Sequence, residues 1–217
     1  LETTLATGVV KDTTGARDNY EFEEQNYGFF VSDDINLTDR LLLTAGIRAE
    51  LLKSESTDRR TARIEHRPLT IDLTPSVHLR YRIFEQTNRR ASFAQTVRRP
   101  QFDQLIPSLE ETATQFKLGN PQLRPEKANN YEVHVEHFWP NGLLSAGTYY
   151  RELRDKQEEV IIGRSGAKDI FQFTNVGNGT LWGAEFEAMR QLDFLPYEWM
   201  RYFRLRANYT WTISSKV

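Results

Sequence analysis

The chain has 217 residues, of which 39% are hydrophobic, and its formal net charge at pH 7 is -2. Balanced charge excludes general electrostatic capture of nucleic acid, and the absence of cysteine excludes disulfide frameworks and thiolate metal sites. No apolar run approaches the roughly 20 residues of a membrane-spanning helix, but a β-barrel, whose strands are apolar on one face only, is still allowed.

The N-terminal half predicts alternating strands and connections. Residues 1–21 lack sustained periodicity and predict a loop, with part of a strand at residues 5–10. Apolar residues then recur at every second position, which is the period of a pleated strand. The predicted strands are 25–37, 41–51, 70–83 and 91–97, separated by a tight turn at 38–40, a charged loop at 53–68 and a turn at 84–88.

The C-terminal half repeats this arrangement. Pro100 cannot donate to a central ladder, so the fourth strand is expected to end at Arg98 or Arg99. The further predicted strands are 131–136, 143–154, 180–191 and 201–214, with a short strand allowed at 160–162. Their connections are a long loop at 99–127, an Asn-Gly turn at 139–142, a loop at 155–175 and a turn at 192–200.

These elements give an all-β, antiparallel, up-and-down arrangement of about eight strands in four hairpins. Short turns alternate with longer loops, which is typical of an outer-membrane barrel with brief periplasmic turns and extended extracellular loops. The apolar rows are then expected to face lipid, and the ionic rows to face a lumen. The predicted lumen-facing residues are Arg48, Glu50, Asp72, His78, Arg80, Arg82, Arg98, Glu132, Glu136, Glu185, Glu187, Arg204 and Arg206.

The size of the barrel follows from those ionic rows. An eight-stranded barrel has an interior just wide enough for its own side chains. So many long charged side chains fit a wide, wet lumen better, and we therefore expect the chain to be part of a larger barrel. An open sheet of this kind has two long edges that neighbouring strands must cover.

Three motifs carry a family resemblance. The segments "TVRRPQFDQL" (96–105), "GNPQLRPEKANNYEV" (119–133) and "TNVGNGTLWGAEFEA" (174–188) follow one another in the chain. As an ordered set they resemble the strand and loop signatures of TonB-dependent outer-membrane receptors, over residues from about 27 to the C-terminus. The resemblance implies a barrel of about 22 strands, an N-terminal plug, and energised uptake through a TonB partner.

The resemblance also implies partners and a ligand site. It places the chain in the bacterial outer membrane, in contact with lipid, and its ligand would be an iron–siderophore complex, cobalamin or an oligosaccharide. No plug or signal peptide precedes Leu1, so we expect residues 1–217 to be a fragment of the barrel domain that meets the TonB complex through a plug it lacks. The candidate ligand-binding residues lie in the longest loop and are Arg99, Gln101, Phe102, Asp103, Gln104, Phe116 and Lys117.

Two other readings of the same strands stay open. One is a soluble, lipocalin-like binding module in which Ile71, Leu73, Val77 and Leu79 point inward. The other is a complete small outer-membrane barrel, used as an anchor or adhesin, in which the first strand would pair with the last.

Enzymatic and metal-binding readings find little support in the residues. His134 and His137 fall on opposite faces of a strand, so no metal site is predicted. Glu185 and Glu187 share a face, but we expect them to pair with arginines of neighbouring strands. No nucleophile motif is present, so the sequence predicts neither a catalytic residue nor a cofactor.

Overall fold

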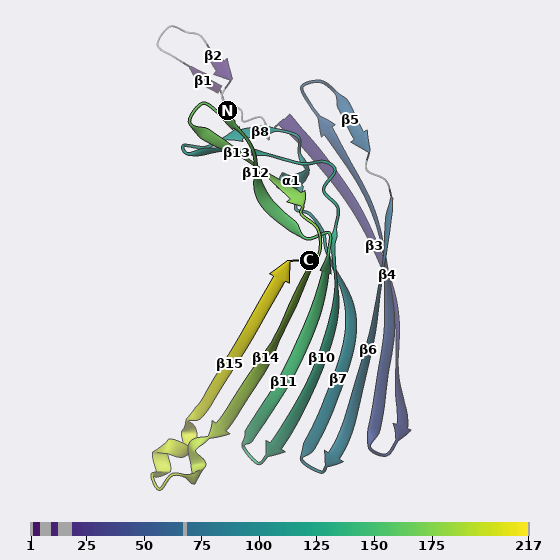
Figure 1. The fold of residues 1–217 in the computed structure, drawn as a ribbon, viewed down its shortest axis with the longest axis vertical. Helices are drawn as coiled ribbons and strands as arrows, with labels where there is room; N and C mark the ends of the chain where they lie inside the picture. Colours follow the sequence, from purple (N-terminus) through teal and green to yellow (C-terminus); the bar gives the residue numbers. More distant parts are fainter. Residues whose placement is uncertain (1, 5–9, 13–18, 67–68, 217) are drawn as a thin grey trace.

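The protein is dominated by one long, curved antiparallel sheet. In the computed structural model, residues 2–4, 10–12, 19–66 and 69–216 are described. The main path of the sheet runs in the order β15-β14-β11-β10-β7-β6-β4-β3 (Figure 1). Its strands are β3 (Tyr20–Thr38), β4 (Leu41–Asp58), β6 (Thr70–Phe84), β7 (Thr87–Arg98), β10 (Glu126–Trp139), β11 (Gly142–Arg154), β14 (Gly179–Gln191) and β15 (Arg204–Lys216).

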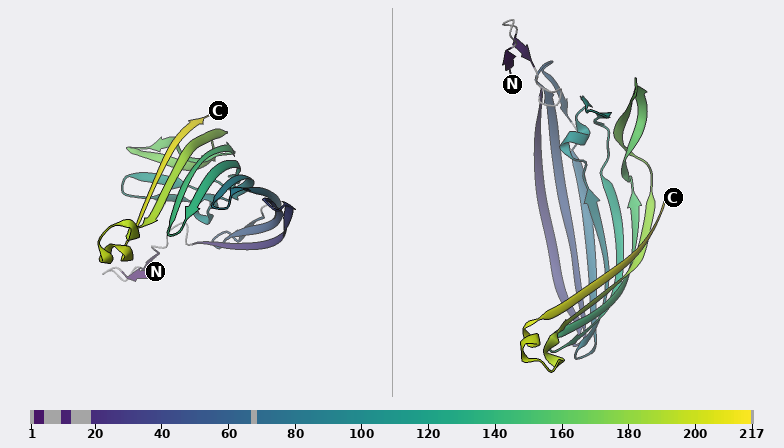
Figure 2. Two further views of the ribbon diagram at one scale, coloured as in Figure 1. Left: turned by 90° about the horizontal axis from the view of Figure 1, so that it is seen from below. Right: turned by 90° about the vertical axis from the view of Figure 1, so that its left-hand side faces the viewer.

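The described strands curve like part of a barrel wall without closing on themselves (Figure 2). The path ends at β3 on one side and at β15 on the other, and these two strands do not pair in the described part of the chain. The predicted all-β fold and its eight strands are therefore confirmed. A complete eight-stranded barrel, in which the first strand pairs with the last, is not observed.

The register sorts side chains onto two faces, because successive residues of a strand point to opposite sides. One cross-strand row joins Leu43, Leu79, Ala91, Val133 and Ala184, and we call its side of the sheet the apolar face. The adjacent row joins Thr44, His78, Ser92, Glu132 and Tyr149 on what we call the polar face.

The apolar face is open to the surroundings. The side chains that a soluble module would bury are 59% exposed for Ile71, 55% for Leu73, 37% for Val77 and 38% for Leu79. These rows do not form a sealed interior, so the arrangement required by the lipocalin-like reading is absent from the described residues.

Connections differ between the two ends of the sheet. The predicted turns near residues 39, 85 and 140 lie together at one end, which we call the turn rim (Figure 1). The fourth connection on that rim holds two 3-10 helices, η2 (Leu192–Phe194) and η3 (Glu198–Tyr202). The longer connections gather at the opposite end, the loop rim, so the predicted asymmetry is confirmed.

Two connections predicted as loops fold into a second sheet. Residues 99–127 contain α1 (Phe102–Leu105), β8 (Leu109–Glu111) and β9 (Gln115–Leu118), and residues 155–175 contain β12 (Gln157–Ser165) and β13 (Lys168–Asn175). The short strand allowed at 160–162 is thus part of β12. The order is β12-β13-β9-β8, and β9 pairs with β13 in parallel. The sheet consists of two local hairpins, β8–β9 and β12–β13, and only the β9–β13 pair joins segments far apart in sequence. Periodicity cannot predict that long-range pair, so it did not reveal the sheet.

Strand lengths also exceed the prediction at the loop rim. β4 continues to Asp58, and β5 (Arg63–His66) pairs back onto it inside the predicted loop 53–68. β3 begins at Tyr20, within the segment predicted as a loop, and β1 (Glu2–Thr4) pairs with β2 (Val10–Asp12). The partial strand expected at 5–10 falls mostly outside the described residues. The extension of β4 after Leu52 is polar, and in the extension of β3 the register puts Tyr20 and Phe22 on the polar face. Neither extension therefore continues the apolar row that marks these strands in the sequence.

No helix in the described ranges combines the length and the apolar character needed to cross a membrane.

A small buried core fixes the long loop over the polar face. Ile106 and Leu123 are almost fully buried, at 1% and 0% exposure, and Leu105 lies beside them at 8%. Gly119 passes so close to Ile106 that a Cβ atom there would collide with the Ile106 carbonyl. The glycine of the "GNPQLRPE" segment is therefore required by the close approach of two backbones.

We expect Gly119→Ala to loosen this loop while leaving the main sheet paired. Overpacking against a backbone carbonyl costs about 1–3 kcal/mol, which corresponds to about 5- to 150-fold faster exchange. Hydrogen exchange at the β9 amides would measure it. Gly163→Ala is the matched control, because a Cβ there meets only Ile170 Cδ1 at 3.8 Å, an ordinary contact. Equal exchange rates in the two variants would contradict the conclusion that the close approach of Gly119 to Ile106 holds the loop.

Candidate functional site

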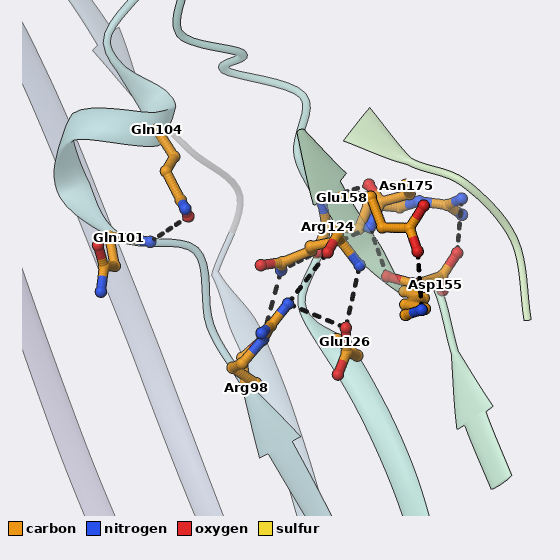
Figure 3. A network of polar contacts seen from close by, with 10 residues as sticks. Arg98, Gln101, Gln104, Arg124, Glu126, Asp155, Glu158 and Asn175 are labelled. Carbon is orange, nitrogen blue, oxygen red and sulfur yellow. Dashed lines mark hydrogen bonds and ion pairs between the residues drawn. The ribbon is translucent and has the colours of Figure 1, made fainter. Parts of the chain in front are cut away.

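The residues predicted to contact ligand do not converge on one point. Gln101 and Gln104 close the turn of α1, where the Gln101 N–H donates to Gln104 Oε1 at 2.9 Å (Figure 3). Phe102 packs edge-on against Phe22 of β3, with ring centroids 4.9 Å apart. Asp103 is exposed. This part of the predicted set forms a folded elbow above the polar face.

Phe116 and Lys117 belong to a different element, β9 of the second sheet. They are neighbours in β9 and therefore point to opposite sides. Lys168 Nζ lies 5.5 Å from the Phe116 ring centroid, and Lys117 Nζ lies 3.9 Å from Glu159 Oε1. Both side chains have partners within the loop rim, so they help to fold it.

Arg99 lies at the centre of a group of charges that we call the rim ion cluster. The register places Glu50 of β4 directly opposite Asp72 of β6, a repulsive pair if left alone. Arg99 Nη1 lies 2.6 Å from Glu50 Oε2, and its Nη2 lies 3.1 Å from Asp72 Oδ2. Arg48 Nε contacts Glu50 Oε1 at 2.6 Å, and Lys127 Nζ contacts Asp72 Oδ1 at 3.0 Å. Three cations thus hold two adjacent carboxylates and tie β4, β6, β10 and the end of β7 together.

The electrostatics of Arg99 reflect this position. Burial alone would lower the pKa of the guanidinium, but the two carboxylates, led by Glu50, outweigh burial and raise that pKa above its ordinary value. Arg99 is therefore charged at neutral pH. Its role in the structure is to neutralise the Glu50–Asp72 pair.

A second network clamps the small sheet to the wall. Glu126 Oε2 accepts from Arg98 Nη2 and from the Gln157 N–H, both at 3.0 Å (Figure 3). The buried Gln157 side chain donates through Nε2 to the carbonyl of Arg124 at 2.8 Å. β7, β10 and β12 are thereby held at one point, which we call the rim joint.

The motif segments supply the rest of the rim joint. The Arg124 N–H donates to Asn175 Oδ1 at 2.9 Å, and Asn175 Nδ2 donates to the carbonyls of Arg124 and Asp155 at 3.0 and 2.7 Å. Arg124 also pairs with Asp155 at 2.7 Å. Asn120 Nδ2 donates to the Phe173 carbonyl at 3.0 Å. The "NPQLRPE" and "TNVGNG" segments therefore contact each other, which explains their polar side chains in structural terms.

The register places every residue predicted to face the lumen on the polar face. A hollow of about 870 Å³ lies on that face, lined in part by His78, Arg80, Glu132, Glu136 and Glu185. Cross-strand ion pairs form at Glu136 and at Glu187, as expected for Glu187, whereas Glu185 makes no ion pair with the described residues. Arg90 Nη1 lies 3.0 Å from Glu136 Oε1, and Arg206 Nε lies 2.8 Å from Glu187 Oε1.

Cations dominate the exposed surface of these ion pairs. The exposed fractions of the side chains are 46% for Arg48 and 19% for Glu50, 52% for Lys127 and 5% for Asp72, and 59% for Arg98 and 13% for Glu126. Each carboxylate is covered by its partner, while the partner still faces the space beside the polar face. At these three pairs the groups that face that space are therefore cations, although the chain as a whole is slightly acidic.

The sequence did not single out several residues that build this region. Lys127 and Arg124 lie inside the quoted motif, and their charge next to a predicted strand was the available signal. Gln157 and Asn175 carry no such signal, because their importance comes from carbonyls distant in sequence. Within the described residues, no group of three or more His, Asp or Glu side chains is arranged to hold a metal ion.

Comparisons with known proteins agree with this geometry. A family model described as "TonB dependent receptor-like, beta-barrel" matches residues 3–217. No curated protein matches the chain. Solved structures share the fold, and the chain spans less than half the length of each of those described next.

The siderophore receptor PirA from Pseudomonas aeruginosa is similar at 16% identity and a TM-score of 0.63, over 91% of this chain and 44% of that one. The ferric enterobactin receptor PfeA, also from Pseudomonas aeruginosa, is similar at 21% identity and a TM-score of 0.64, over 89% of this chain and 27% of that one. The FrpB iron transporter from Neisseria meningitidis is similar at 15% identity and a TM-score of 0.59, over 91% and 27%.

We expect Arg99→Gln to destabilise the loop rim in a salt-dependent way. The variant leaves the Glu50 and Asp72 carboxylates opposite each other without the cation between them, which lowers the free energy of local opening by about 1–3 kcal/mol. Salt screens the repulsion between the two carboxylates, so the loss should shrink as the salt concentration rises. Hydrogen exchange in α1 at low and high salt would measure it, with Asp103→Asn as control. A loss of equal size at both salt concentrations would contradict this account.

Proposed function

Because the chain belongs to the family of TonB-dependent receptor-like β-barrels, we propose that it forms part of the wall of an outer-membrane active-transport receptor. In this proposal the complete receptor binds a scarce extracellular ligand and imports it with energy delivered by the TonB complex. The family consists of receptors and transporters, and the role proposed for this chain is transport, without catalysis or a resident cofactor. The site would accordingly bind the ligand and release it unchanged.

One observation carries the proposal: an apolar face and an ionic face run along the whole set of antiparallel strands. Exposed apolar rows of this extent need a partner, and bacterial outer-membrane lipid supplies one for every strand at once. The polar face would then border the lumen and a plug domain, through which the TonB complex acts. The turn rim would face the periplasm, and the loop rim would face the outside.

The charge of the loop rim supports an anionic ligand. Arg48, Arg98 and Lys127 turn exposed cationic groups toward the space that a ligand would enter, while their carboxylate partners are covered. Among the three ligand classes allowed by the resemblance, an iron–siderophore complex with anionic oxygen donors fits this surface better than cobalamin or a neutral oligosaccharide. One of the similar structures is a siderophore receptor by name and another is a ferric enterobactin receptor, which agrees with this choice.

The loop residues keep a place in this proposal, in revised roles. Gln101, Phe102, Asp103 and Gln104 would meet ligand as one elbow above the rim ion cluster. Phe116 and Lys117 would act from the second sheet. Arg99 is held by two carboxylates, so we assign it to positioning Arg48 and Lys127 around the Glu50–Asp72 pair, with no direct grip on ligand.

We expect Arg48→Gln and Lys127→Gln each to weaken binding of an anionic ferric siderophore by the full-length receptor about three- to tenfold. Each variant removes one half-exposed, charge-assisted contact, which is worth less than the buried value of about 1.5–3 kcal/mol. Titration at low and high salt would measure the effect, which should diminish as salt screens it.

Arg40→Gln, at the opposite rim, is the matched control and should bind as the wild type does. Uptake by cells lacking TonB should stop while surface binding persists. Preferred binding of a neutral oligosaccharide, unaffected by these substitutions and by salt, would refute the anionic-ligand assignment. Uptake that persists without TonB would refute the transport proposal.

A further inference from the structure

The connection between β14 and β15 is unlike the other connections on the turn rim. The others turn within a few residues, whereas residues 192–203 project from the rim as η2 and η3 (Figures 1 and 2). Neither helix buries a residue, so this connection contributes no core. It instead exposes five aromatic side chains, at 57% for Phe194, 59% for Tyr197, 58% for Trp199, 74% for Tyr202 and 56% for Phe203. A role in folding therefore does not explain why residues 192–203 contain so many aromatic side chains.

The aromatic side chains of η3 connect to the apolar face. Phe203 is extended and its carbonyl accepts from the Leu192 N–H, so the β14–β15 hairpin continues to this residue. Strand alternation then puts Phe203 on the same side as Leu205, which is itself on the apolar face. The Trp199 ring meets the Phe203 ring edge-on at 5.7 Å, and the Tyr197 ring lies 6.3 Å from that of Trp199.

Arg190 brings a cation to the same patch. The register joins Arg190 to Gly142 on one side and to Leu205 on the other, so it lies on the apolar face. Its guanidinium lies 4.6 Å from the Phe194 ring centroid and 5.8 Å from the Trp139 ring centroid. Gly142 leaves room for the Trp139 indole, because a Cβ atom there would collide with it. The cation is therefore held between two rings at the edge of an apolar surface.

We propose that Trp139, Arg190 and residues 192–203 form a phospholipid-binding pad that lies in the headgroup region of the periplasmic leaflet. Tryptophan and tyrosine favour this level, where the ring meets glycerol and acyl chains and the polar edge meets water. Arg190 donates to the lipid phosphate. The inference rests on the membrane position given under the proposed function, and it adds a lipid site that strand patterning alone does not provide.

Continuity with the lipid-facing strands favours lipid over a periplasmic protein as the occupant. Leu205, Tyr209 and Trp211 follow Phe203 on the same face of β15, and they are 61%, 64% and 43% exposed. Along this surface, Trp211, Tyr209 and Leu205 would lie among acyl chains, and Trp199 and Arg190 would lie at the level of the headgroups. This order matches the change from hydrocarbon to phosphate across half a bilayer. The pad would anchor the edge of the wall at this depth.

Fluorescence quenching of the full-length protein in phosphatidylethanolamine vesicles tests the site. The difference in emission between the wild type and Trp199→Phe gives the signal of Trp199. The difference between the wild type and Trp211→Phe gives the signal of Trp211, which lies further along the apolar face. We expect lipid brominated near the glycerol to quench Trp199 strongly, and aqueous acrylamide to quench it weakly. Trp199 sits on an exposed turn, so its replacement should not disturb folding.

The outcomes distinguish a failure of the lipid-binding pad from a failure of the membrane position of the strands. If brominated lipid quenches Trp211 while Trp199 is open to acrylamide alone, the pad faces water or a protein and the inference fails, with the membrane position intact. If lipid quenches neither residue, the membrane position itself fails. If lipid quenches both, the position of the pad is supported.

The phosphate contact is tested by substitution. We expect Arg190→Gln to lose a phospholipid that stays bound to the wild type in native mass spectrometry. Arg204→Gln is the matched control, because the register places Arg204 on the polar face at the same rim. Equal phospholipid retention in the two variants would overturn the role of Arg190.

Discussion

The structure depends on one constraint, the antiparallel register across eight strands, which shifts only beside two of the turns, between Asn36 and Thr38 and between Arg82 and Phe84. Each strand exposes every second side chain to one side, so a one-residue slip would exchange the two faces of that strand. The rows from Leu43 to Ala184 and from Thr44 to Tyr149 show that no such exchange occurs over their length. A surface suited to hydrocarbon and a surface suited to water can therefore lie one strand thickness apart.

Small residues let this register carry large side chains on the polar face. The imidazole of His134 occupies the space above Gly147 on the neighbouring strand, and the Tyr149 ring occupies the space above Gly183. A Cβ atom at either glycine would collide with the ring beside it. The glycines thus allow rings to lie flat along the wall, so that the lumen proposed on that side keeps its width.

The sequence predicts those parts of the molecule in which local alternation and tertiary position coincide. Ile71, Val77 and Leu79 reveal their face because β6 is amphipathic along its length. The same reasoning does not predict the second sheet, because Phe116 of β9 and Ile170 of β13 form a parallel pair that no local sequence pattern encodes. Arg99 was expected to bind ligand because it is a cation in a long loop, and only the register shows that two carboxylates occupy it.

Cationic side chains have different neighbours at the two rims. At the loop rim, arginine and lysine cover buried carboxylates, so the wall is stiffened by ion pairs that leave positive charge facing outward from each pair. At the turn rim, Arg190 lies against the Phe194 and Trp139 rings, which do not neutralise its charge, and it makes no ion pair with a carboxylate of the described residues. A cation held by rings keeps its full attraction for an anion, whereas a cation held by a carboxylate keeps only part of it. The rings at the turn rim therefore suit tight retention of a phosphate group, and the paired cations at the loop rim suit a ligand that has to be released.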